Sequence, residues 1–234
     1  DALGRLARTV DHAGYAISFD HDANGNLVEV TDSLGNTLRS DLYDSHGLLT
    51  TSWDADRGGW RYEYDALGNL VSQTDANGRT TTWIWDVLGR PLARVMPEGT
   101  GSITSSWTWG TSAAAREIGR LKRVEISGQG IVTYAETYSF DALGRLMRTQ
   151  YTEGTGTHSV DLGYSGFTGR LETLAYPATS DGYRLRLRYR EQNGHLLQVE
   201  DAQSPGTVFW RADATDARGE VVAETLGNGI RSTR

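Results

Sequence analysis

The sequence predicts an all-β fold, a long antiparallel β-meander built from repeats whose sheet coils. Three observations predict it: a glycine-centred motif recurs along the chain, residues alternate with period two between turns, and no segment has the period of an amphipathic helix. The chain has 234 residues, a net charge of −7 and no cysteine. This composition argues against nucleic-acid binding and excludes disulfides and thiolate metal sites.

The repeated motif is an aromatic residue, Asp, two further residues, Gly, and then usually Arg or Asn before Leu. Its glycines lie 21 or 22 residues apart up to Gly89 and 25 residues apart from Gly119 onward. Within one repeat region, 1–234, we therefore distinguish short-period repeats over 1–89, an irregular joint over 90–118 and long-period repeats over 119–234. We expect structural roles for the residues of the clearest copies, which are Tyr43, Asp44, Gly47, Tyr64, Asp65, Gly68, Trp85, Asp86, Gly89, Phe140, Asp141 and Gly144.

Each motif predicts a hairpin turn. An aspartate at the first turn position can accept hydrogen bonds from the backbone just beyond it, and a glycine at the end adopts positive φ without steric cost. Asp65–Gly68 should therefore form a type I turn followed by a bulge. A second turn glycine lies about halfway along each repeat, so the meander should contain roughly 20 short strands.

The clearest strands, in chain order, are 60–64, 83–85, 107–109 and 183–190. Trp60, Tyr62 and Tyr64 alternate with charged residues, which is typical of a half-buried strand. The aromatic side chains should lie on one face of the sheet, and that face has to be covered. Ala113–Glu117, in the joint, is the one segment that could form a turn of helix.

The motif, as in Tyr64-Asp65-Ala66-Leu67-Gly68-Asn69-Leu70, resembles the YD repeat of Rhs proteins, which has relatives in the C component of bacterial Tc toxins and in teneurins. In that family the repeats form a β-sheet strip that spirals into a hollow shell, which in bacterial members encloses a C-terminal toxin or effector. The resemblance implies a non-enzymatic scaffold, secreted or at the cell surface. Its expected partners are flanking YD repeats and a C-terminal effector domain of the same polypeptide.

Two features depart from the family pattern. Family shells usually end in a plug region with an aspartyl self-cleavage site, often written around Asp-Pro, but this sequence has no Asp-Pro and no toxin domain. The chain starts inside one motif and ends at the start of another, so we expect a piece of a longer polypeptide. Its end strands should favour self-association through their edges. No apolar run is long enough for a transmembrane helix.

Candidate sites for chemistry are few. Asp20–Asn26 resembles the front of an EF-hand calcium loop, but Thr31 stands where a bidentate glutamate is needed, so a hairpin is preferred. The five histidines lack metal-ligand spacing, and no phosphate loop or nucleophile elbow is present. We predict no catalytic, cofactor-binding or metal-binding residue.

The sharpest local feature is a row of four arginines on one face of a strand. We expect acidic neighbours such as Glu172 and Glu200 to pair with this row. The alternative is contact with an anionic partner, such as an enclosed cargo. The arginine row comprises Arg184, Arg186, Arg188 and Arg190.

The aromatic residues leave a second function open. Seven tryptophans and eleven tyrosines would suit a cell-surface glycan-binding or adhesion repeat module in which rings stack on sugars. Most of them alternate in phase with Leu and Val, however, and this favours packing on the apolar face.

Overall fold

The computed structural model describes residues 1–233, and its regular elements are β-strands throughout. The predicted all-β class is confirmed, with twenty strands in the described part of the chain. No helix that could span a membrane is present among these residues. The chain divides into two compact units, one of residues 1–106 and 127–131 and the other of residues 107–126 and 132 onward.

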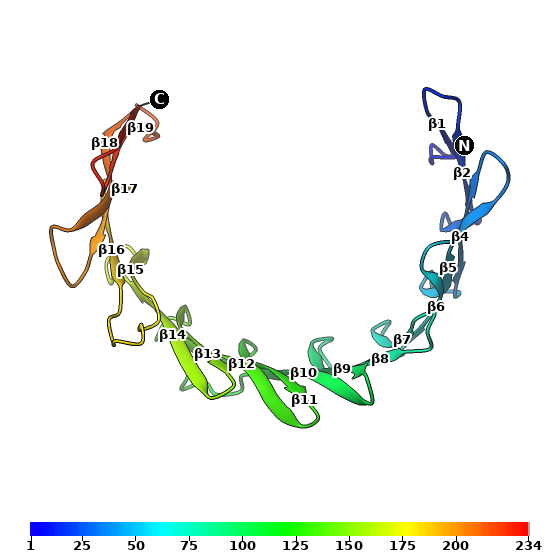
Figure 1. Ribbon diagram of the computed structural model, residues 1–234, viewed down its shortest axis with the longest axis horizontal. Coiled ribbons are helices and arrows are strands. Elements are labelled where there is room, and N and C mark those ends of the chain that lie inside the picture. Colours follow the sequence, from blue (N-terminus) through cyan, green and yellow to red (C-terminus); the bar gives the residue numbers. More distant parts are fainter. Residues whose placement is uncertain (234) are drawn as a thin grey trace. The chain divides into compact units, whose positions relative to one another are not determined.

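The first unit is a β-meander in which each strand pairs antiparallel with the next along the chain, from β1 to the beginning of β10. Figure 1 shows its hairpins following one another in sequence order. Its strands are β1 (Arg8–Val10), β2 (Ala16–His21), β3 (Leu27–Asp32), β4 (Thr37–Tyr43), β5 (Leu49–Asp54), β6 (Gly58–Tyr64), β7 (Leu70–Thr74), β8 (Thr80–Trp85), β9 (Pro91–Glu98) and β10 (Gly101–Trp109).

The second unit repeats this architecture with longer hairpins. From β12 to β20, every strand again pairs antiparallel with its successor. Its strands are β11 (Leu121–Gly128), β12 (Ile131–Phe140), β13 (Leu146–Glu153), β14 (Gly156–Tyr164), β15 (Leu171–Ala175), β16 (Arg186–Gln192), β17 (His195–Asp201), β18 (Val208–Thr215), β19 (Val221–Leu226) and β20 (Arg231–Thr233).

The segment 90–118 contains β9, β10 and a turn-rich stretch that follows them. The expectation of a helical turn at Ala113–Glu117 is wrong, because this segment forms hydrogen-bonded turns instead. The Arg116 N–H donates to the Ala113 carbonyl at 3.1 Å, and the Arg120 N–H donates to the Glu117 carbonyl at 2.8 Å. Arg116 has a positive φ of 56°, a conformation that ends a right-handed turn.

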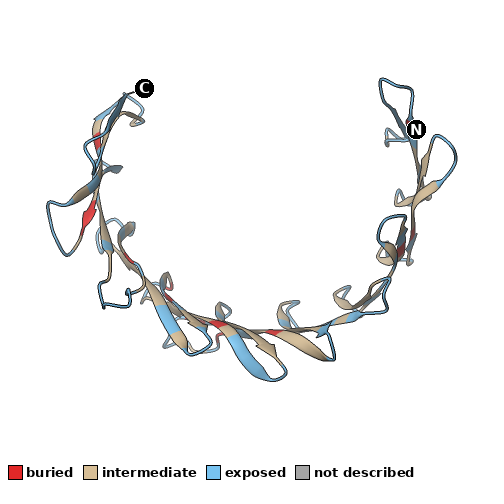
Figure 2. Ribbon diagram, viewed as in Figure 1, coloured by how far each residue is buried: buried red, intermediate tan, exposed pale blue. Residues whose placement is uncertain are grey.

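Each unit is a single layer, because its strands contact only their neighbours along the chain and no second sheet lies against either face in the described part. Figure 2 shows accordingly few buried residues and many of intermediate exposure. Along β6, Trp60 and Tyr62 are half-buried while Arg61 and Glu63 are exposed, so the predicted alternation is confirmed. The buried apolar residues among the described ones are all alanines, namely Ala16, Ala135, Ala175 and Ala212.

Candidate functional site

The motif turn is organised by its aspartate. In the copy at 65–68, one carboxylate oxygen of Asp65 accepts the backbone N–H groups of Leu67 and Asn69, both at 2.9 Å. The Gly68 N–H donates to the Asp65 carbonyl at 3.0 Å, and Gly68 has a φ of +82°. The strand register shifts at Tyr64, next to the turn. The predicted turn with its bulge is therefore present.

The other clear copies have the same geometry. In each, the aspartate accepts backbone N–H groups two and four residues later, and the glycine has positive φ. The register shift falls at the motif aromatic residue each time. These copies are Tyr43-Asp44 with Gly47, Trp85-Asp86 with Gly89, and Phe140-Asp141 with Gly144.

The motif aromatic residue links its repeat to the preceding one. The Tyr64 hydroxyl donates to the Leu49 carbonyl at 3.0 Å, and Leu49 is the leucine of the previous motif. Three further hydrogen bonds follow the same rule. They join Tyr43 to Leu27 at 3.0 Å, the Trp85 indole N–H to Leu70 at 2.7 Å and Tyr164 to Leu146 at 2.8 Å.

Within each unit, the residue after a motif glycine links its repeat to the following one. Arg145 forms an ion pair with Asp141 at 2.6 Å and donates to the Gly169 carbonyl at 2.9 Å. Its guanidinium also lies 4.2 Å from the centre of the Tyr164 ring. Phe140 has no hydroxyl, and its ring instead contacts Arg120 of the preceding repeat, at 5.3 Å.

These contacts form what we call the turn column, in which the residue after one motif glycine lies against the next motif glycine. The glycine therefore has two functions: it supplies positive φ, and it leaves room for a neighbouring side chain. The pairs are Arg5 with Gly25, Asn26 with Gly47, Leu48 with Gly68, Asn69 with Gly89, Arg120 with Gly144, Arg145 with Gly169, Arg170 with Gly194 and His195 with Gly219.

The turn hydrogen bonds lower the pKa of the motif aspartates. The Asn69 side-chain amide, followed by its backbone N–H, lowers the pKa of Asp65 from its ordinary value of 3.8. For Asp86 the backbone N–H of Arg90 is the largest cause of a pKa lowered in the same direction. The pKa values of the motif aspartates Asp22 and Asp44 are lowered as well, and so is that of Asp32 in the turn halfway along a repeat.

We expect the fold to lose stability in acid. A carboxylate whose folded pKa lies below its unfolded pKa stabilises the protein above the unfolded value, and this stabilisation is lost as pH falls through the folded value. The loss should therefore begin near 3.8, the ordinary aspartate value, and continue below it. Urea midpoints followed by circular dichroism from neutral pH down to about pH 2 test this. Unchanged midpoints across this window would contradict it.

The aromatic face also holds polar groups. Asp41 is buried, and its carboxylate accepts a hydrogen bond from the Ser52 hydroxyl at 2.6 Å. The carboxylate also forms an ion pair with the Arg39 guanidinium at 2.7 Å. The angles of this ion pair are not those of a hydrogen bond. In the second unit, Glu136 accepts the hydroxyls of Tyr134 and Tyr138. The hydrogen bond to Glu136 is the largest cause raising the pKa of Tyr134, to about 12.

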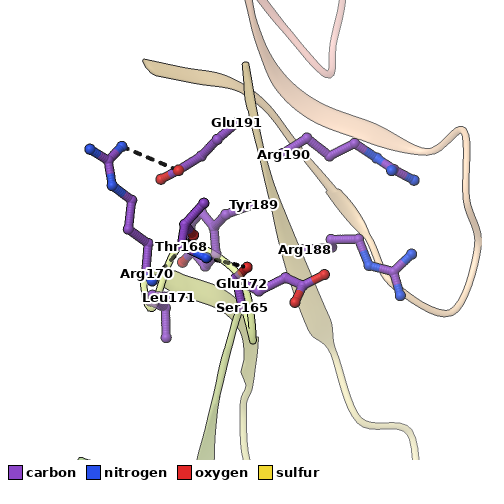
Figure 3. A pocket seen from close by; sticks show the side chains of 9 residues that line it. All are labelled: Ser165, Thr168, Arg170, Leu171, Glu172, Arg188, Tyr189, Arg190 and Glu191. Carbon is purple, nitrogen blue, oxygen red and sulfur yellow. Dashed lines mark hydrogen bonds and ion pairs between the residues drawn. The ribbon is translucent and has the colours of Figure 1, made fainter. Parts of the chain in front are cut away.

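The arginine row is only partly neutralised. Glu200 pairs with Arg190 at 2.7 Å, one of the two partners expected from the sequence. The strand predicted over 183–190 begins only at Arg186, so Arg184 precedes β16 and the expectation of four arginines on one strand is wrong for Arg184. Arg184 pairs with Asp161 at 2.9 Å, and the sequence did not point to that residue because it lies two strands away. Glu172 and Arg188 line the same pocket (Figure 3), but no ion pair joins them.

No group of three or more histidine or acidic side chains that could hold a metal ion occurs among residues 1–233. At Asp20–Asn26, the carboxylate of Asp22 is engaged by the backbone N–H groups of Asn24 and Asn26, as in the other motif turns. The geometry of this segment is therefore that of a hairpin.

Comparison with known proteins finds similar repeats in the first hundred residues. The family model described as RHS Repeat matches residues 1–37, 43–74 and 64–100. The Tc holotoxin pore of Photorhabdus luminescens, in a TccC3 variant, is 17% identical with a TM-score of 0.51, and the match covers 96% of this chain and 13% of that chain. The crystal structure of TcdB2-TccC3-Cdc42 is 14% identical with a TM-score of 0.46, covering 97% of this chain and 16% of that one.

No curated protein sequence matches the chain. The chain spans less than a fifth of the length of either solved structure. At this identity, the likeness to the Tc holotoxin pore shows a shared fold alone. The repeats matched by the family model lie in the first hundred residues, where the motif period is short.

Proposed function

We propose that the chain is a non-enzymatic structural segment of an RHS (YD-repeat) shell that encloses or presents a C-terminal toxin or effector domain. The matches of the RHS Repeat family model in the first hundred residues support this, as does the fold shared with the Tc holotoxin pore. In this proposal its partners are flanking YD repeats and the effector domain of the same polypeptide. The short-period and long-period stretches are two parts of one wall, and the whole acts outside the cell or at its surface.

The turn column is the observation that carries this proposal. Within each unit, the residue after one motif glycine lies against the next motif glycine, so the same contact extends the sheet by one repeat at a time. Arg145 illustrates this, since it joins Asp141 of its own turn to the Gly169 carbonyl of the next. Such nearest-neighbour coupling suits a wall of any length.

The uncovered aromatic face supports the same proposal. A single-layer sheet with half-buried Trp60 and Tyr62 leaves apolar surface that a monomeric domain would normally cover. In a shell this surface would face an enclosed domain. The shell would then keep proteases away from the enclosed domain. Its own strands resist cleavage because their backbone groups are held in hydrogen bonds.

Limited proteolysis of the complete polypeptide tests the proposal. We expect an effector domain that resists protease as long as the wall is intact. The double substitution Gly144→Val and Arg145→Ala, which breaks the turn column at one repeat, should speed cleavage of the effector by about tenfold or more. Gly166→Ala is the matched control, because Gly166 has no atom within 4 Å of an added Cβ and no positive φ.

An effector digested as fast in the intact polypeptide as in isolation would overturn the enclosing role. Binding on a glycan array that disappears when exposed rings such as Trp53, which is 43% exposed, are replaced would instead support the adhesion module. Light scattering on the isolated segment tests the expected edge-to-edge self-association, and a strict monomer at high concentration would exclude it.

A further inference from the structure

The arginine row borders a hollow of about 330 Å³ on one face of β14, β15 and β16. Small residues in its lining, such as Gly163, Ala175 and Ala202, leave space above the sheet, and three arginines line it as well. Figure 3, centred on the adjacent pocket, shows Arg188 and Arg190 on one side of the β16 ribbon and the paired Arg170 and Glu191 on the other. The lining includes Asp161, Gly163, Ala175, Arg184, Arg186 and Arg188.

Two of these arginines, Arg186 and Arg188, have no ionic partner among residues 1–233. Arg188 lies opposite Glu200, but that carboxylate already accepts Arg190 and Gln198, at 2.7 and 2.9 Å. The Nε atom of Arg188 is buried and makes no hydrogen bond. Arg186 lies opposite Ala175, which offers no side-chain acceptor.

The carboxylate of the hollow does not neutralise these two cations. Asp161 is engaged by Arg148 and by Arg184, the latter at 2.9 Å. Three guanidinium groups and one carboxylate line the hollow, which leaves two positive charges in a chain whose net charge is −7. A buried donor without an acceptor is costly, and a ligand with several acceptor oxygens would remove this cost.

We propose that this hollow binds a phosphate or sulfate group through Arg186 and Arg188. Guanidinium groups present planar pairs of donors that match the oxygens of tetrahedral oxyanions, and two of them complement a doubly charged group better than a single carboxylate. The hollow is large enough for such a group, and the side of the group away from the sheet remains open to a molecule that carries it.

Calorimetric titration with inorganic phosphate and with a heparin oligosaccharide tests the site and separates a free anion from a sulfated glycan. We expect saturable binding to the unchanged chain that weakens about tenfold in Arg188→Gln and about a hundredfold in the double variant Arg186→Gln, Arg188→Gln. Arg61→Gln is the control: Arg61 is exposed on β6, outside the hollow, and should leave binding unchanged.

A second measurement distinguishes a loss of anion binding from a loss of folding stability in the variants. The Arg188 Nε–H resonance in a nitrogen-15 spectrum should shift and become protected from exchange when the anion binds. The pair Arg186→Lys, Arg188→Lys keeps the charge but loses the paired donors, so its affinity should be intermediate. Failure of both ligands to saturate at millimolar concentration, or equal weakening in Arg61→Gln, would overturn the proposal.

Discussion

Replacing Gly110 by alanine should lower the free energy of unfolding by about 3 kcal/mol. Gly110 is buried, its N–H donates to the Arg120 carbonyl at 2.8 Å, and its carbonyl accepts the Gly119 N–H at 3.0 Å. An added Cβ would clash with the Glu117 carbonyl oxygen and lie 2.6 Å from the Glu117 Cβ. Because one of the clashing atoms belongs to the backbone, the clash can be relieved only if the loop that leads into β11 moves.

Gly128→Ala is the matched control for this substitution. Gly128 lies in β11, has no positive φ, and has open space where the Cβ would be placed. Its replacement should change stability by less than about 1 kcal/mol. Urea unfolding gives both values, and amide hydrogen exchange should show the Gly110 effect concentrated around 107–126. Equal effects of the two substitutions would show that the close approach at Gly110 contributes little.

Replacing Asp41 by alanine should cost about 2 kcal/mol. The Asp41 side chain is 1% exposed, and its removal leaves the Ser52 hydroxyl without its acceptor and Arg39 without its counter-ion. The cost is lower than for a fully buried ion pair because the Arg39 side chain is 38% exposed and can turn towards water.

The control is Asp20→Ala, since Asp20 is an exposed aspartate on β2. It should change stability by less than about 0.5 kcal/mol. Asp41→Asn keeps an acceptor for Ser52 but removes the charge, so it should fall between the two. If Asp41→Ala is no more destabilising than Asp20→Ala in urea unfolding, the buried carboxylate has no stabilising role.

The motif turns could be predicted because their causes are local. The hydrogen bonds of Asp65 reach only four residues along the chain, and the positive φ of Gly68 is a property of one residue. The alternation of half-buried and exposed side chains along β6 could be predicted for the same reason, since successive side chains of any strand point to opposite faces. The proposed helical turn at Ala113–Glu117 was wrong because alanine propensity is weak beside the turn that Gly110 and Gly119 close.

The residue pattern was therefore enough to predict the all-β class, the repeat, the turns and the arginine row. The contacts between repeats became known only from the folded chain. Tyr64 donates to the Leu49 carbonyl and Arg145 to the Gly169 carbonyl. Asp161 pairs with Arg184, while Arg186 has no ionic partner among residues 1–233. These contacts could not be predicted because they join different strands. They depend on register and bulges, which position side chains from distant parts of the chain and leave no local signal.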